Sequence, residues 1–202
     1  IFSVAQNKLW EIDPLTGATA LVANVPADIR GLAFSSSGVL YGLRNGTQDS
    51  LVIINEVSGA VTLVGGTGLS ALQALEFSPD GTLYGIDLSK GLVKINTSTG
   101  QATDVNPSVG GGAQALAITP AGVAYRGTLS DIHLIDLQTG VSSLIGGSGY
   151  NDLRGLACFQ VPDLPPTGSL EDAAPNILWP PNNKSKSVAI CGNSSAGSAP
   201  IA

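Results

Sequence analysis

The segment Asp13-Pro-Leu-Thr-Gly17 decides the fold, because its turn pattern returns three times along the chain. The later copies are Asn55-Glu-Val-Ser-Gly59, Asn96-Thr-Ser-Thr-Gly100 and Asp136-Leu-Gln-Thr-Gly140, at spacings of 42, 41 and 40 residues. Each copy begins with a side chain that can accept hydrogen bonds from its own turn, and ends with a glycine that tolerates a positive φ. A period of about 40 residues with strand-like content is typical of propeller blades or stacked arrays.

Each repeat holds four short runs of alternating or β-rich composition, separated by Gly and Asx turns. In one complete copy we expect strands at residues 72–77, 83–87, 92–96 and 101–105. Four antiparallel strands per repeat make one propeller blade.

The phase of the repeat predicts how the ring closes. Ile1-Phe-Ser-Val-Ala5 aligns with the second strands of the later copies, whereas residues 153–159 align with the first strands. We therefore expect residues 1–5 to pair with residues 153–159 in one composite blade, which would leave no free sheet edge. The expected fold is an all-β, closed four-bladed β-propeller over residues 1–159.

The stretch Ala74-Leu-Glu-Phe-Ser-Pro-Asp-Gly-Thr-Leu-Tyr-Gly-Ile-Asp87, together with Thr99-Gly100, resembles the NHL- and YVTN-type propeller repeats of secreted microbial proteins. The resemblance covers residues 1–159 and implies a propeller fold. Proteins with such repeats include binding modules and lyases, so the resemblance implies no single activity. None of their catalytic metal-ligand patterns is matched in this sequence.

The composition changes after Phe159. We expect a Pro-rich linker over residues 160–175 and an extended tail over residues 176–202. Leu178-Trp-Pro-Pro-Asn182 resembles a linker at the entry to Ig-like modules of secreted bacterial proteins. Two alternatives stay open: the tail straps its own propeller, or its 187–191 run adds as a strand to a neighbouring subunit. The residues expected to be buried in either case are Ile177, Leu178, Trp179, Val188 and Ile190.

The composition of the chain argues against nucleic acid as a partner and against a membrane span. There are 15 Asp and Glu against 9 Lys and Arg, without a basic run that could follow a phosphate backbone, so nucleic acid is not an expected partner. No apolar run approaches the roughly 18 residues of a membrane span. The lack of Met, the strand pattern at the first residues and the Gly-, Ser- and Thr-rich composition favour a processed protein located outside the cell or on its surface.

Two kinds of covalent modification are suggested. Cys158 and Cys191 form one possible disulfide, which the secreted composition favours, and a buried thiol at Cys158 is the alternative. Glycosylation sequons occur at Asn45, Asn96, Asn183 and Asn193.

Catalytic chemistry finds little support. The single histidine, His133, occupies a strand column that is otherwise mostly apolar, and we interpret it as a packed strand residue. One histidine cannot build a His-based zinc site, and no Gly-x-Ser-x-Gly elbow is present. We therefore expect a protein that is not an enzyme and that has no cofactor and no bound metal.

One polar constellation stands out. Asp28-Ile-Arg-Gly-Leu-Ala33 and Asp152-Leu-Arg-Gly-Leu-Ala157 repeat a motif, and Gln73 and Gln114 fill the column of Arg30 and Arg154 in the other repeats. Such a ring at one channel mouth could hold a small anion, a carboxylate or a glycan. The alternative is that the Asp28 and Asp152 carboxylates pair with the arginines and close the ring.

Three function classes remain. We favour a non-enzymatic extracellular structural protein that assembles into a homo-oligomer, filament or surface layer through its tail. A ligand- or glycan-binding propeller is the alternative, and a hydrolase or lyase ranks last because general acid and base candidates are scattered.

Overall fold

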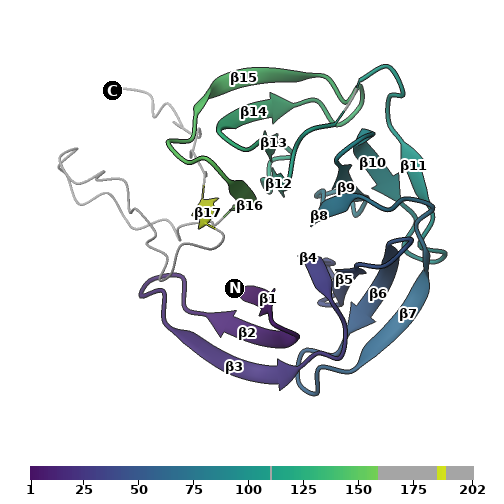
Figure 1. Ribbon diagram of the computed structural model, residues 1–202, viewed down its shortest axis with the longest axis vertical. Helices are drawn as coiled ribbons and strands as arrows, with labels where there is room; N and C mark the ends of the chain where they lie inside the picture. The colour runs from purple at the N-terminus through teal and green to yellow at the C-terminus, as the bar shows by residue number, and fades with distance from the viewer. Residues whose placement is uncertain (110, 159–185, 190–202) are drawn as a thin grey trace, which may run out of the picture.

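The computed structural model describes residues 1–109 and 111–158 and the backbone of residues 186–189. Over these residues the regular elements are all β-strands, in four sheets placed around a central axis with a further strand pair beside them (Figure 1). The expectation of an all-β, four-bladed β-propeller is confirmed.

Within each blade the strands follow the sequence order from the axis outward, and neighbouring strands are antiparallel. Blade 1 contains β1 (Phe2–Ala5), β2 (Lys8–Ile12) and β3 (Thr19–Asn24). Blade 2 contains β4 (Ile29–Phe34), β5 (Leu40–Arg44), β6 (Ser50–Ile54) and β7 (Val61–Gly66). Blade 3 contains β8 (Leu72–Phe77), β9 (Leu83–Asp87), β10 (Gly91–Ile95) and β11 (Ala102–Asp104). Blade 4 contains β12 (Ala115–Ile118), β13 (Ala124–Gly127), β14 (Asp131–Ile135) and β15 (Ser142–Gly147).

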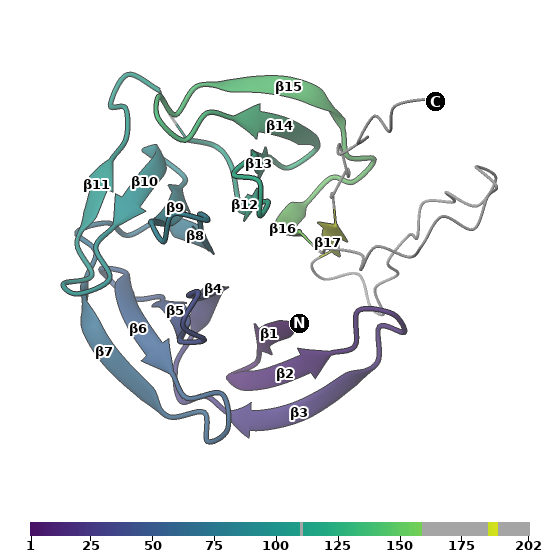
Figure 2. The same cartoon turned by 180° about the vertical axis from the view of Figure 1, so that it is seen from behind.

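The expected pairing of residues 1–5 with residues 153–159 is wrong. β16 (Leu153–Ala157) instead pairs in parallel with β17 (Lys186–Ala189), a strand of the C-terminal tail, and β1 pairs with β2. The β16–β17 pair lies between blade 4 and blade 1, as the view from behind shows (Figure 2). The phase of the repeat counts only repeat strands, so it misses a partner strand that the tail supplies. Blade 1 consequently has three strands where blades 2, 3 and 4 have four.

The blades pack through a recurring contact between neighbours. An aromatic side chain of one blade packs on the aromatic residue that ends the innermost strand of the next blade. Phe2 of β1 packs on Phe34 of β4, and Tyr41 of β5 packs on Phe77 of β8, each pair with ring centroids 5.5 Å apart. Two apolar clusters make the corresponding contacts later in the chain, one between blades 3 and 4 and one between blade 4 and β16. Phe2, Tyr41, Tyr84 and Tyr125 hold equivalent positions in the four blades, and each belongs to one of the apolar clusters of the core.

The repeated turns form as expected. The Asp13 carboxylate accepts hydrogen bonds from the backbone N–H groups of Leu15 and Thr16, and Asp136 does the same two and three residues ahead. These bonds hold the pKa of both carboxyls below the usual range. The closing glycines have φ of 70°, 72°, 78° and 67° along the four copies, a region that glycine adopts readily.

Candidate functional site

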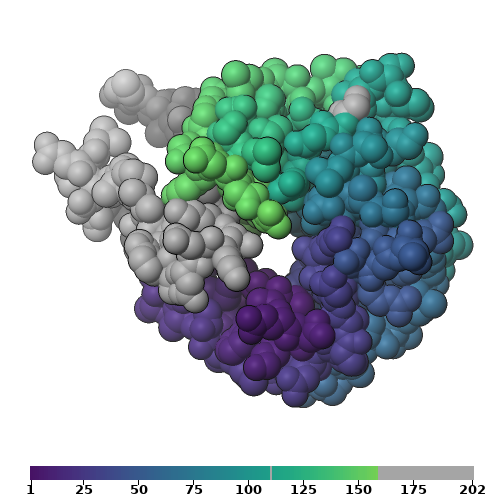
Figure 3. Space-filling view, in the orientation of Figure 1, coloured from purple at the N-terminus to yellow at the C-terminus, as the bar shows by residue number. Residues whose placement is uncertain are grey.

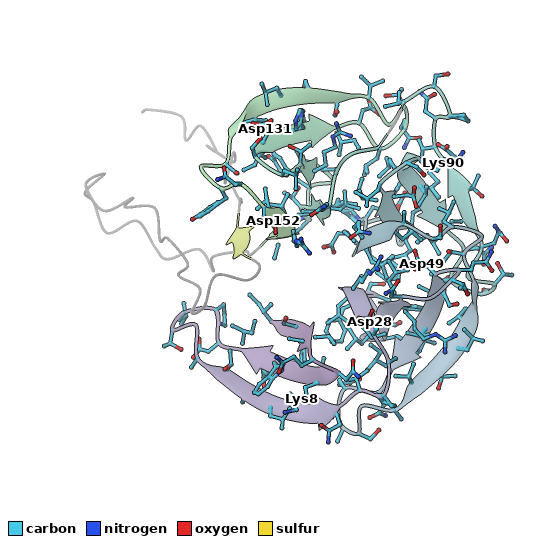
Figure 4. The ribbon with its side chains drawn as sticks, in the orientation of Figure 1. Lys8, Asp28, Asp49, Lys90, Asp131 and Asp152 are labelled. Carbon is cyan, nitrogen blue, oxygen red and sulfur yellow. The ribbon has the colours of Figure 1, made fainter. Side chains whose placement is uncertain are left out.

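The predicted polar ring lies where the inner strands begin. Each repeat runs in the same direction, so the starts of β4, β8, β12 and β16 meet at one end of the axis, and these starts carry the ring members Arg30, Gln73, Gln114 and Arg154. The molecule is hollowed near this axis in the space-filling view (Figure 3). By the strand order, the same end of the blades also has charged residues at strand starts and in loops, among them Lys8, Asp28, Asp49, Lys90, Asp131 and Asp152, which Figure 4 labels.

The two aspartates of the motif have different partners. The Nε of Arg154 lies 2.8 and 2.9 Å from the two carboxylate oxygens of Asp152, in a pair whose side chains are 59% and 48% exposed. This carboxylate raises the pKa of Arg154. Asp28 instead accepts a hydrogen bond of 2.6 Å from the side-chain amide of Asn45. Asp–Arg pairing is thus a local contact at β16, and it does not join one blade to another.

The remaining ring members differ in their exposure and in their hydrogen bonds. Arg30 is exposed, and in the described part of the chain it has no ion pair. Gln73 is half-buried and donates to the carbonyl oxygen of Ala71 at 3.2 Å. The Oε1 of Gln114 is buried, and no described residue donates a hydrogen bond to it. The ring therefore has one exposed cationic group, that of Arg30, without an ion pair among the described residues.

Asp49 and Asp87 form a buried carboxylate pair between blades 2 and 3, which the sequence does not predict. Asp49 is 0% and Asp87 is 1% exposed. The Oδ2 of Asp49 accepts the N–H of Leu72 at 2.9 Å and so ties blade 2 to the first strand of blade 3. Asp87 accepts from Ser89 and Lys90 within its own loop. One oxygen of each carboxylate, Oδ1 of Asp49 and Oδ2 of Asp87, is buried without a partner among the described residues.

The surroundings of Asp49 act on the pKa of its carboxyl in both directions, and the net effect is to raise it. Burial raises the pKa of the Asp49 carboxyl, the hydrogen bond from Leu72 and the charge of Arg30 oppose that rise, and the negative charge of Asp87 adds to it. We interpret the pair as an inter-blade contact. The sequence does not predict this contact, because an aspartate next to the end of a strand is typical of an ordinary turn.

His133 lies in β14 opposite Arg126 of β13 and is half-buried, which agrees with the interpretation of a packed strand residue. Burial lowers the pKa of His133, and the charge of Arg126 lowers it further. Arg126 takes the place of Gly42 and Gly85 in the preceding blades. Burial lowers its pKa as well, and its Nε has no partner within the described ranges.

A cavity of about 950 Å³ lies at the opposite end of blades 3 and 4. Its lining includes the turn at residues 78–80, the ring of Tyr84 and the apolar side chains Val123 and Val141. Because this turn follows the end of β8, the cavity and the polar ring are at opposite ends of the propeller. They do not form one site.

Two further observations concern the described residues alone. Within residues 1–109, 111–158 and 186–189, no group of three or more His, Cys, Asp or Glu side chains could hold a metal ion. The same part of the chain includes no helix with the length and apolar character that a bilayer crossing requires.

The chain matches no protein-family model and no curated protein sequence. Solved structures nevertheless share its fold. A nidogen/laminin complex structure is 16% identical with a TM-score of 0.59, over 76% of this chain and 62% of that one. A protein of unknown function from Bacteroides thetaiotaomicron VPI-5482 is 14% identical with a TM-score of 0.57, over 77% and 53%. The PQQ-bound aldose sugar dehydrogenase of Streptomyces coelicolor is 18% identical with a TM-score of 0.50, over 75% and 65%.

These similarities establish the β-propeller fold and no shared activity. The chain spans less than two thirds of each of these three structures. The resemblance to NHL- and YVTN-type repeats is accordingly supported at the level of the propeller fold.

Proposed function

We propose that this protein is a non-enzymatic interaction module of the cell exterior that associates with copies of itself through its C-terminal tail. The observation that carries the proposal is the pairing of β17 with β16, because it identifies a tail segment that adds as a strand to a propeller edge. Strand addition supplies affinity through main-chain hydrogen bonds and is a recurring mode of recognition.

The β16–β17 pair is suited to exchange between copies. It is a two-stranded sheet, and such sheets are marginal by themselves. It is also parallel, which is the slightly weaker arrangement per residue. In the β16–β17 register Leu156 lies opposite Val188, and the tail of a neighbouring copy can supply an identical β17 in the same register. An exchange of tails between two copies therefore has a small cost in free energy. The two alternatives for the tail, its own propeller or a neighbour, therefore use one and the same edge.

Location and lack of catalysis rest on the sequence. The Gly-, Ser- and Thr-rich composition and the resemblance to repeats of secreted proteins support a place outside the cell or on its surface. The absence of any recognised catalytic motif in the sequence supports a binding or structural role over a hydrolase or lyase. Of the proposed tail contacts, Ile177, Leu178, Trp179 and Ile190 lie outside the described residues, as do the linker and the sequons Asn183 and Asn193.

Removal of residues 176–202 should leave a folded propeller and abolish the part of the self-association that the tail makes, because the repeats supply the core before the tail begins. Val188→Pro in the full chain should act alike, since proline lacks the N–H that a paired strand donates. Light scattering and a melting curve test both, with Ser195→Pro as a control outside β17. A tail that only straps its own propeller would lower the melting temperature without changing particle mass. A wild-type protein that stays monomeric at every concentration would contradict the proposal.

A Cys158–Cys191 disulfide is part of this proposal. Cys158 follows β16 directly, and the β16–β17 register sets Ala157 opposite Ala189, two residues before Cys191 in the sequence; Cys191 itself lies outside the described residues. Closing this loop would restrain the unfolded chain by about 3–4 kcal/mol. Intact mass should rise by two hydrogens on reduction. A native mass that already corresponds to two thiols would rule the disulfide out.

Binding of a small anion or a glycan at the polar ring is the second candidate. The exposed guanidinium of Arg30 favours it, because such a group can bind a carboxylate through charge-assisted hydrogen bonds. Arg30→Gln should then weaken binding of a carboxylate probe such as citrate by roughly 10-fold, the loss of one charge-assisted hydrogen bond. Calorimetry on both proteins measures this, with Arg44→Gln as a control. Equal affinities would remove this candidate.

A further inference from the structure

The outer rim of the propeller carries unusually little charge. β3, β7 and β15 have six residues each, and none of those residues is charged. The rim strand of blade 3 differs, because β11 has three residues and ends at Asp104. In the described part of the molecule β3, β7 and β15 are each paired with a strand along one side only, so their other sides have N–H and C=O groups that no neighbouring strand pairs (Figure 1). In β11, by contrast, the N–H of Ala102 donates to the carbonyl oxygen of Thr67. A protein with a net charge of −6 thus keeps its charges off three exposed edges.

The three long rim strands share an exposed leucine at the third position. Leu21, Leu63 and Leu144 are 50%, 55% and 63% exposed. The next residue sets β15 apart: Ile145 is 58% exposed, whereas the equivalent valines of β3 and β7 are half-buried. The β14–β15 register shifts at this point, so Ile145 is the extra residue of a β-bulge, and two neighbouring large apolar side chains, Leu144 and Ile145, are exposed there.

The position of β15 explains this exposure. In blade 2 the side chain equivalent to Ile145, Val64, packs into the cluster shared with blade 3. Blade 4 is followed by the β16–β17 pair, which has no outer strand among the described residues. Val141, 53% exposed, extends the same apolar surface at the start of β15. β15 is thus an uncharged edge strand with an exposed apolar surface, and exposed apolar edges can pair with other strands.

We propose that β15 is a second self-association surface, at which β15 of one copy pairs antiparallel with β15 of another across a twofold axis. A second copy fits because the edge is self-complementary. An antiparallel pair of this strand sets apolar and small residues opposite one another, and it brings no like charges together, although each copy is acidic overall. Gly146 and Gly147 leave the end of the strand without side chains that would obstruct the approach.

The rim contact adds to the tail contact of the proposed function and is independent of it. An exchange of tails between two copies is a closed contact and ends at a dimer. A twofold contact at β15 is likewise closed. A subunit that has both contacts, through different surfaces, joins two neighbours and continues the assembly as a filament.

The full-length variant with Leu144→Lys and Ile145→Lys tests the rim contact. Both side chains are exposed, so the melting temperature should stay close to wild type. Where the wild type forms long polymers, light scattering should find this variant at the mass of a tail-linked dimer, Val188→Pro at the mass of a rim-linked dimer, and the combination at the monomer mass. A variant with Leu21→Lys and Leu63→Lys serves as the control and should polymerise.

Hydrogen exchange gives a second readout on unmodified protein. Amides of residues 141–147 should become more protected as the concentration rises, whereas those of β11 should not. A β15 variant with the wild-type particle size, or β15 amides whose exchange does not depend on concentration, would overturn the rim contact and leave the tail proposal standing. Polymers or dimers that survive Val188→Pro but vanish with the β15 variant would instead overturn the tail contact.

Discussion

Gly100→Ala should lower the free energy of unfolding by about 3 kcal/mol or more, and Gly17→Ala by only about 1 kcal/mol. Both glycines close the same repeated turn, with φ of 78° and 70°, so the cost of a left-handed backbone is common to both. Their surroundings differ. A Cβ at Gly100 would overlap the carbonyl oxygen of Gly65 in β7 and approach the Gly65 Cα to 2.9 Å, whereas a Cβ at Gly17 would have no atom within 4 Å.

The other two copies of the turn extend the test. Gly59→Ala should behave like Gly100→Ala, because a Cβ at Gly59 would overlap the carbonyl oxygen of Asn24. Gly140→Ala should resemble Gly17→Ala, since its nearest neighbour would be 3.6 Å away, an ordinary contact. Urea unfolding of the four variants measures the difference. Equal losses at all four positions would show that the contact with the preceding blade contributes nothing.

The repeated turn therefore has two roles, of which the sequence reveals one. The positive φ of its glycine follows from the turn pattern itself. The close approach to the preceding blade depends on a neighbour about 35 residues earlier in the chain, and the first copy has no preceding blade in the described structure. Local patterns predict local backbone, and contacts between blades require the three-dimensional arrangement.

Strand positions were predictable because alternation and turn residues act locally. Residues 72–77 and 83–87 form strands as expected, while the other two strands of that blade are displaced by one residue or shortened at their ends. Ring closure was not predictable in the same way. A β-strand edge accepts any strand that reaches it, so the pairing of β16 depends on competition between β1 and the tail, and the repeat phase contains no information on the tail.

The candidate site shows the same division. Equivalence between repeats predicts that Arg30 and Arg154 share a column, and each is the second residue of its strand, β4 or β16. It does not reveal that Asn45 donates to Asp28 or that Asp49 accepts the N–H of Leu72, because Asn45 and Asp49 lie in the loop between β5 and β6, whose length differs from that of the equivalent loops in the other blades.

Glu76→Gln should stabilise the protein by about 2–3 kcal/mol at pH 8 and should have little effect near pH 4.5. Glu76 is a half-buried residue of β8, the inner strand of blade 3. The equivalent positions of the other inner strands hold alanine: Ala33, Ala117 and Ala157. Burial raises the pKa of the Glu76 carboxyl from 4.5 to about 7, and a hydrogen bond from the N–H of Phe77 opposes that rise only in part.

The sign follows from proton binding. Between pH 4.5 and about 7 the carboxyl is protonated in the folded protein and ionised in the unfolded chain, so the folded state binds more protons. The wild type is therefore most stable with respect to this group below pH 4.5, loses stability as the pH rises to about 7, and remains less stable above that value. Glutamine keeps the shape and cannot ionise, which removes this part of the pH dependence.

Urea unfolding of wild type and Glu76→Gln at both pH values measures the effect, with the exposed turn residue Glu56 changed to Gln as the control. Lowered carboxyl pKa values elsewhere, as at Asp13 and Asp136, contribute in both proteins and cancel in the comparison. A Glu76→Gln effect of equal size at both pH values would show that Glu76 remains ionised in the folded state. The predicted result would mean that the Glu76 carboxyl, on the inner strand of blade 3, becomes charged as the pH passes through about 7, and that this charge lowers the free energy of unfolding.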